Sequence, residues 1–216
     1  MYKACIFDMD GTIANTLSSI AGFGNQALKE YGCPTIAIET YRYLVGNGAD
    51  QLMRGMLRTV KGEYTEEDVQ KLRQIYDRCY AEDPLRGVEN YPGMPDLLAE
   101  LNRRNILLAV LSNKPDDMAR AVADKLFPGV FQIVRGQTPG VPRKPSPEGA
   151  FRIATELGVL PQECLYLGDT DVDMKTGKSA GMKTVGVLWG FRTREELEQG
   201  GAELLAETPE DILKFL

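Results

Sequence analysis

The chain reads Ile6-Phe7-Asp8-Met9-Asp10-Gly11-Thr12 at the end of its first apolar run, and this stretch decides the fold. Residues 3–7 form a short apolar segment bounded by Asp and Gly, which is typical of a strand covered on both faces. In an open α/β sheet, ligands bind beyond the carboxyl ends of the strands. The sequence therefore predicts that Asp8 and Asp10 stand where a substrate arrives.

The spacing of these two aspartates suits phosphoryl transfer. A carboxylate can attack phosphorus and form an aspartyl phosphate, which divides one difficult hydrolysis into two displacements, and we assign this role to Asp8. Residues two apart on an extended segment point to the same side, so Asp10 can protonate the leaving oxygen and later accept a proton from water. Gly11 allows a sharp turn, and Thr12 offers a hydroxyl and an amide to Asp8 or the phosphate. The alternative interpretation is that Asp-Gly is only a turn.

The Asp-x-Asp-x-Thr pattern of this stretch resembles the first motif of the haloacid dehalogenase superfamily of aspartate-nucleophile phosphotransferases. In that family a second strand ends in Ser or Thr, and here the apolar run 106–111 is followed by Ser112-Asn113-Lys114-Pro115. The resemblance implies that Ser112 binds a phosphoryl oxygen. Asn113 is predicted to add its backbone N–H to the phosphate site, with a helix starting at the proline. A serine in this place can equally be the N-cap of a helix.

The third motif of the family is a lysine, which Arg143-Lys144-Pro145-Ser146-Pro147 supplies after a loop rich in Gly and Pro. Pro145 restricts the preceding Lys144 to extended conformations. A cation here would reduce the repulsion between the aspartates and stabilise charge on the phosphoryl group. Lys144 is therefore predicted to be catalytic and to bind phosphate, although a single lysine is normally a solvated surface residue.

The fourth motif follows the apolar run 164–167, where the chain reads Gly168-Asp169-Thr170-Asp171-Val172-Asp173. The family pattern is Gly-Asp with another Asp four positions on, and Asp169 and Asp173 match it. Asp171 is predicted to cap the helix that begins near Val172.

Four carboxylates in one crevice would cost several kcal/mol without a cation. Ligands that are all oxygens favour Mg²⁺, which keeps some waters and shares the substrate phosphate with one or two carboxylates. We assign Asp8 and Asp169 as side-chain ligands and Asp10 as a ligand through its backbone carbonyl. We assign Asp173 to a position next to these ligands, without direct contact with the metal.

Composition narrows the functional classes. Asp plus Glu number 31 against 25 Lys plus Arg, giving a net charge of −6, which disfavours nucleic acids and anionic membranes as partners. The four cysteines lack close pairs and are interpreted as reduced thiols of a cytoplasmic protein. The absence of His excludes sites that need imidazole. The first apolar run is interrupted at Asp8, so we expect neither a signal peptide nor a transmembrane helix.

The gap between the first two motifs indicates a helical insertion. Apolar residues with helical spacing form stripes at residues 18–31 and 49–60. A third stripe of this kind follows Thr65, which is a potential N-cap. We predict an α/β protein: a Rossmann-like parallel sheet of the haloacid dehalogenase type from residues 1–15 and 86–216, with an all-helical cap of residues 16–85 inserted after the first strand. Further strands are predicted at 106–111, 130–134, 164–167 and 183–187, and an active-site loop at 135–147. The resemblance implies that the cap closes over the site and excludes water.

The residues that select the substrate are expected to lie in the cap, because the core motifs contact only the phosphoryl group. The turn Val45-Gly46-Asn47-Gly48 resembles the cap loop of phosphoglycolate phosphatases, and we select Asn47 and Arg54 as specificity residues. An arginine near this turn, Arg42 or Arg54, can hold a substrate carboxylate through two hydrogen bonds. Two solvated helix arginines are the alternative.

These features predict a Mg²⁺-dependent phosphomonoester hydrolase that acts on a small phosphorylated metabolite such as 2-phosphoglycolate, as a monomer or homodimer. The alternatives within the superfamily are an inorganic pyrophosphatase and a phosphosugar mutase of the β-phosphoglucomutase type, although Thr12 stands where mutases commonly have a bulkier apolar residue. Retention of Asp10 argues against a dehalogenase. The intact motif set argues against a binding protein without activity.

Overall fold

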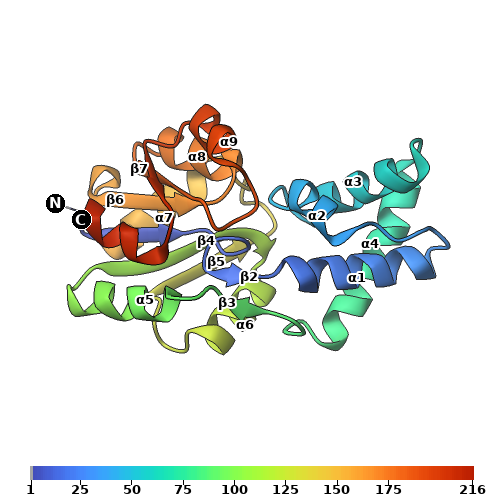
Figure 1. Cartoon of the computed structure of the whole chain (residues 1–216), viewed down its shortest axis with the longest axis horizontal. Coiled ribbons are helices and arrows are strands. Elements are labelled where there is room, and N and C mark those ends of the chain that lie inside the picture. The colour runs from blue at the N-terminus through green and yellow to red at the C-terminus, as the bar shows by residue number, and fades with distance from the viewer. Residues whose placement is uncertain (1) are drawn as a thin grey trace. The chain divides into compact units, whose positions relative to one another are not determined.

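A six-stranded, all-parallel sheet forms the framework of the protein in the computed structural model, which describes residues 2–216. Its strand order is β5-β4-β1-β6-β7-β8. The strands are β1 (Ala4–Phe7), β4 (Leu107–Pro115), β5 (Ile133–Gln137), β6 (Cys164–Gly168), β7 (Lys183–Val187) and β8 (Leu204–Ala206). The chain builds outward from β1 on one side and then returns to add β6 on the other (Figure 1). The carboxyl end of β1 is therefore the point where a sheet of this kind binds its ligand.

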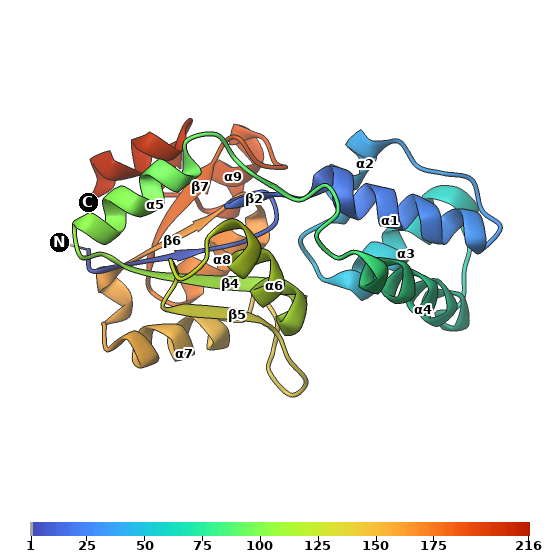
Figure 2. The same cartoon turned by 90° about the horizontal axis from the view of Figure 1, so that it is seen from below.

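Helices cover both faces of this sheet (Figure 2). They are α5 (Met94–Arg103), α6 (Asp116–Leu126), α7 (Glu148–Leu157), α8 (Asp171–Ser179) and α9 (Arg194–Gly200), with 3₁₀ turns at Pro161–Glu163 and Pro209–Phe215. On one face the core contains side chains of β1, β4 and β6 packed against Ala150, Ile153 and Ala154 of α7. Burial on both faces explains why β1 and β6 are continuous apolar runs rather than alternating ones.

The two edge strands, β5 and β8, differ from the predictions. β5 lies three residues beyond the predicted 130–134, so residues 135–137 are strand and the predicted loop 135–147 is shorter. The apolar residues that suggested the earlier start include Phe131, whose ring packs against Phe7 and Phe127. The edge strand β8 was not predicted, because three residues are too few for a periodic pattern.

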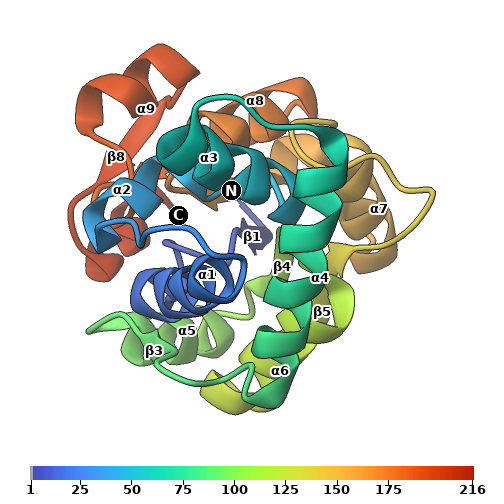
Figure 3. The same cartoon turned by 90° about the vertical axis from the view of Figure 1, so that its right-hand side faces the viewer.

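The chain divides into two compact units, of which the sheet unit comprises the N-terminal residues through Asn15 and Glu89–Leu216. The other unit is Thr16–Val88, and its four regular elements are helices: α1 (Leu17–Glu30), α2 (Ile38–Leu44), α3 (Ala49–Lys61) and α4 (Glu66–Glu82). In Figure 3, α1 and α3 both pack on α4. The short α2, which was not predicted, has Tyr41 as its buried residue.

A two-stranded antiparallel sheet lies where the chain leaves the sheet unit and where it returns to it. It pairs β2 (Ala14–Asn15) with β3 (Glu89–Asn90). The helical unit therefore follows the first strand β1, as predicted, with the two-residue strand β2 between them. The chain leaves the sheet unit and re-enters it at adjacent positions, because these two strands are hydrogen-bonded to each other.

All four cysteines are free thiols, and Cys5, Cys79 and Cys164 are buried. Among residues 2–216, no helix has the length and apolar character needed to cross a membrane.

Candidate active site

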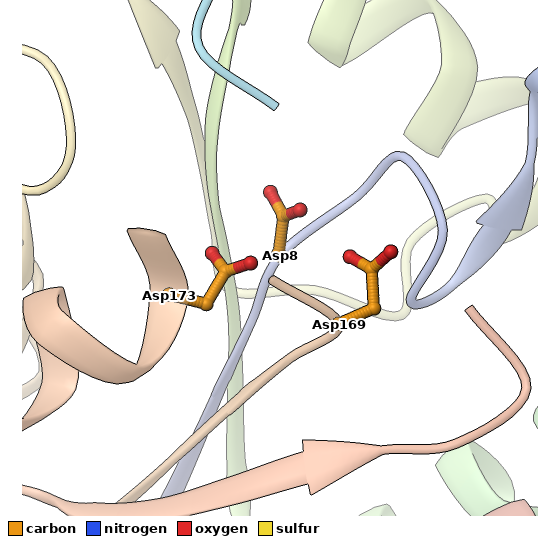
Figure 4. Close-up of side chains that lie close together, drawn as sticks. All are labelled: Asp8, Asp169 and Asp173. Atoms are coloured by element: carbon orange, nitrogen blue, oxygen red, sulfur yellow. The ribbon is translucent and has the colours of Figure 1, made fainter. Parts of the chain in front are cut away.

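Three aspartates meet at the carboxyl edge of the sheet. Asp8 follows β1, Asp169 follows β6, and Asp173 lies in the first turn of α8. Their carboxylates point toward a common space (Figure 4), and one oxygen of each lies within 4.8 Å of the others. All three residues are buried. The parallel topology creates this cluster, because β1 and β6 are adjacent and end at the same edge.

Lys144 lies between two of these carboxylates. Its Nζ is 2.6 Å from Asp8 Oδ1 and 2.7 Å from Asp173 Oδ1. Burial alone would lower the pKa of the Lys144 ammonium, but Asp173 and Asp8 raise it well above its usual value. Burial, followed by the Asp173 charge, raises the pKa of Asp8 to about 7, although Lys144 opposes this rise. The ammonium is thus held charged beside the predicted nucleophile.

The backbone of Lys144 is fixed by the neighbouring motif. The Asn113 side chain donates from Nδ2 to the Lys144 carbonyl at 3.1 Å, and its Oδ1 accepts from the Lys144 N–H at 2.9 Å. Ser112 is buried, and its Oγ accepts a 3.2 Å hydrogen bond from the Lys114 N–H. The strand end of β4 and the Gly- and Pro-rich loop are therefore joined at the site, which the positions of their motifs had predicted.

Asp169 is held by backbone and hydroxyl donors. Its Oδ2 accepts from the Phe191 N–H at 2.8 Å, and its Oδ1 accepts from the Thr12 hydroxyl at 3.3 Å. Burial, then Asp173 and Asp8, raise the pKa of Asp169 well above its usual range. A Cβ atom at Gly11 or Gly190 would overlap Asp169, and Gly11 has a φ of +93°. Glycine is therefore required where two loops close on this carboxylate.

The helix after Asp169 begins differently from the prediction. Asp171 is the first residue of α8, and Thr170 is its N-cap. The Thr170 N–H and hydroxyl both donate to Asp173 Oδ2, at 3.1 and 2.6 Å. Asp171 instead forms an exposed ion pair with Lys175. The predicted cap was wrong because Thr170 and Asp173 have the spacing of a reciprocal capping pair, which satisfies the helix end better than Asp171 alone.

Asp10 contacts Lys114, a residue to which the sequence analysis assigned no role. Lys114 Nζ lies 3.0 Å from Asp10 Oδ1 and 3.1 Å from Oδ2. The Asp10 carboxylate does not belong to the three-aspartate cluster. The sequence signal for Lys114 was its place directly after Ser112 and Asn113, at the end of an apolar run.

Comparison with known proteins agrees with this arrangement. The family model for haloacid dehalogenase-like hydrolases matches residues 5–187. The chain belongs to this family. It is 30% identical to a phosphoglycolate phosphatase of Aquifex aeolicus over 99% of this chain and 96% of that protein, and 29% identical to a phosphoglycolate phosphatase of Salmonella choleraesuis over 99% and 92%. It resembles the crystal structure of a predicted phosphoglycolate phosphatase from Haemophilus somnus 129PT, with a TM-score of 0.91, 26% identity, and coverage of 99% and 97%.

A metal ion fits the cluster of this haloacid dehalogenase-like hydrolase. Asp8, Asp169 and Asp173 offer oxygen ligands from separate elements, and all three are buried. Burial first, and then repulsion between the carboxylates, raises the pKa values of Asp8 and Asp169, and a divalent cation would favour their charged forms. Oxygen-only ligands suit a hard cation.

The loop after β7 contributes contacts that the sequence analysis missed. Trp189 donates from Nε1 to the Thr12 carbonyl at 2.9 Å, and Phe191 holds Asp169 as described above. Because this loop follows the strand 183–187, its position at a strand's carboxyl end was the available signal.

The two predicted specificity residues lie in the helical unit. Asn47 is exposed in the turn between α2 and α3. Arg54 lies on α3 and donates from Nε and Nη2 to the two oxygens of Glu66, at 3.2 and 2.6 Å. Arg42 pairs with Glu39 on α2. Arg54 is thus engaged within its own unit by a carboxylate of the protein.

Proposed function

We propose that the protein is a phosphomonoester hydrolase that acts through an aspartyl phosphate on Asp8. The observation that carries this proposal is the buried Asp8–Lys144 pair at the switch point of the sheet, at 2.6 Å. A carboxylate beside a fixed ammonium can attack phosphorus while the cation stabilises the charge on the phosphoryl oxygens. Ser112 and the Asn113 N–H complete the proposed phosphate site, with Thr12 nearby.

The reaction consists of two displacements. In the first, an Asp8 oxygen forms a bond to phosphorus, the ester P–O bond breaks, and the leaving oxygen takes the proton of Asp10. In the second, a water oxygen attacks the same phosphorus and gives its proton to Asp10, and the acyl phosphate bond breaks. The products are the alcohol, inorganic phosphate and the regenerated Asp8 carboxylate.

We assign Mg²⁺ as the cofactor, bound by Asp8, Asp169 and the backbone carbonyl of Asp10, with Asp173 near these ligands. When bound, the ion would neutralise charge on the phosphoryl group. Activity is expected to disappear in a chelator and to return with Mg²⁺. Excess Ca²⁺ should inhibit, because its larger and looser coordination misplaces the nucleophile. Full activity in chelator would refute this assignment.

The substrate class is proposed from the relatives. Proteins named phosphoglycolate phosphatase share 28–30% identity with almost the whole chain. We therefore propose a small phosphorylated acid such as 2-phosphoglycolate, with the helical unit Thr16–Val88 serving as the cap and Asn47 and Arg54 as its specificity residues. A cytoplasmic location and a monomeric or homodimeric state accompany this proposal.

The direct test measures phosphate release from p-nitrophenyl phosphate and 2-phosphoglycolate in the presence of Mg²⁺. Asp8→Asn should reduce both rates to background while the fold is retained, because an amide cannot form the acyl phosphate. Asp171→Asn is the matched control, because Asp171 is a nearby exposed carboxylate whose ion pair lies outside the proposed site. Wild-type rates in Asp8→Asn would eliminate Asp8 as the nucleophile.

A further inference from the structure

We propose that Lys114 binds a carboxylate on the leaving group of the substrate, so that the sheet unit itself selects phosphorylated 2-hydroxy acids. This inference rests on the proposed phosphatase function and adds a specificity residue to it. Lys114 lies in the sheet unit, so it would act in addition to Asn47 and Arg54, the specificity residues proposed in the helical unit.

Lys114 lies close to the atoms that would react. A general acid must lie within hydrogen-bond reach of the oxygen that it protonates. Lys114 Nζ contacts both carboxylate oxygens of Asp10, at 3.0 and 3.1 Å. Two such contacts in series put the ammonium within about 6 Å of the leaving oxygen. In a phosphorylated 2-hydroxy acid, the carboxyl group is attached to the carbon that bears this oxygen, so it lies within reach of Lys114.

The Lys114 ammonium lies in buried surroundings. The side chains of Lys114 and Asp10 are only 6% and 13% exposed. A charge-assisted contact in such a place is screened less than one at the surface. A single buried ammonium can hold two carboxylates in this protein, because Lys144 contacts both Asp8 and Asp173. Lys114 can therefore hold Asp10 and a substrate carboxylate together.

The two lysines of the site lie beside different aspartates. Lys144 is paired with Asp8 and Asp173, at the end where the phosphoryl group reacts. A substrate carboxylate on the leaving-group side would meet Asp10 and the repulsion of the aspartate cluster. Lys114 supplies positive charge on that side. A phosphate ester with a neutral leaving group has no anion there and gains nothing from this lysine.

The main competing explanation is that Lys114 only orients Asp10. The two roles predict different substrate dependence. Loss of an orienting contact slows every ester whose leaving group needs a proton. Loss of a carboxylate contact additionally weakens only carboxylated substrates.

The experiment compares 2-phosphoglycolate with ethyl phosphate, which has the same carbon number and a similarly poor leaving group but no carboxylate. The measured quantity is the ratio of their kcat/KM values in the wild-type enzyme, Lys114→Met, Lys114→Gln and Lys114→Arg, with circular dichroism as the check of folding. Lys114→Gln keeps a hydrogen-bond donor for Asp10 without the charge, and it replaces Lys114→Met if the latter does not fold. Lys175→Met is the control, because Lys175 belongs to a surface ion pair.

The ratio should fall roughly 10- to 100-fold in Lys114→Met and Lys114→Gln, as expected for one charge-assisted contact, with a raised KM for 2-phosphoglycolate. It should stay close to the wild-type value in Lys114→Arg and Lys175→Met. Equal losses for both substrates would overturn the inference and leave the phosphatase function standing. A wild-type enzyme without any preference for the carboxylated ester would also overturn it, whereas one that hydrolyses neither ester would refute the proposed function itself.

Discussion

The buried aspartates of the active site and Asp68 of the helical unit are held in opposite ways. At the site, burial and neighbouring charges raise the pKa values of Asp8 and Asp169. In the helical unit, a hydrogen bond from the Tyr31 hydroxyl, followed by contacts with Thr65 at the start of α4, lowers the pKa of Asp68. Charges at the site are therefore held against burial and mutual repulsion, whereas Asp68 completes a helix end.

This difference indicates what each group of carboxylates is for. A carboxylate whose folded-state pKa is raised makes the folded state less stable as pH rises through the interval between its unfolded and folded values. A carboxylate whose pKa is lowered stabilises the folded state throughout the neutral range. The charged carboxylates of the site thus lower the stability of the folded state, and a bound cation would restore it. Removing one of these charges should therefore lower activity and raise stability.

The largest expected effect comes from Asp169→Asn. Activity should fall by roughly a thousandfold or more, because a proposed metal ligand is lost. The same change should stabilise the protein in chelator at pH 8 by about 1–3 kcal/mol, since it removes a buried charge near Asp8 and Asp173, and this corresponds to a rise in Tm of several degrees. Calorimetry in chelator measures it. A lower Tm in the variant would contradict the view that this cluster is strained by repulsion.

A medium effect is expected from Arg54→Met in the helical unit. If this unit reads the part of the substrate away from the phosphate, relative kcat/KM values among phosphorylated metabolites should change by roughly tenfold, whereas p-nitrophenyl phosphate should change little. The lost Arg54–Glu66 pair should alter stability by less than about 1 kcal/mol, because it lies at the surface. Arg58→Met, one turn along α3, is the control. A uniform loss across substrates would show that Arg54 serves packing alone.

The smallest effect concerns the pH dependence of the helical unit. Tyr31→Phe removes the main donor to Asp68 and should lower Tm slightly at pH 7. Because the folded-state pKa of Asp68 is lowered, this contribution is complete above its unfolded value near 4 and disappears as pH falls through the folded value. The difference in Tm between variant and wild type should therefore shrink toward pH 2. Tyr64→Phe is the control, and a difference that grows in acid would contradict the assignment.

The sequence predicted the buried strands and the aspartates that follow them because both depend on local patterns. Cys164–Gly168 is an apolar run that ends in Gly before Asp169, and the parallel sheet brings its carboxyl end beside that of β1. The grouping of Asp8, Lys144 and Asp173 followed from motif order. The edge strand β8 and the helix α2 were missed because short elements with few buried residues leave no periodic signal.

Contacts between distant side chains could not be predicted in the same way. The pairing of Lys114 with Asp10 joins residues 104 positions apart, and the place of Lys114 after an apolar run does not indicate which carboxylate it contacts. Asp171 was chosen as a helix cap because three acidic or hydroxyl residues compete there, and the choice depends on which one has an extended backbone. Thr170 does, with φ −131° and ψ 163°.

The most direct test of the account is to locate the covalent intermediate. In Asp10→Asn, p-nitrophenyl phosphate should still transfer its phosphoryl group, because its leaving group needs no proton, whereas the second step lacks its base. Acid quenching followed by borohydride reduction converts an aspartyl phosphate to homoserine, which peptide mass spectrometry can locate. If Asp8 is the nucleophile, homoserine should appear at position 8 in near-stoichiometric amount. Turnover of substrate without homoserine at that position, or its appearance at another aspartate, would contradict it.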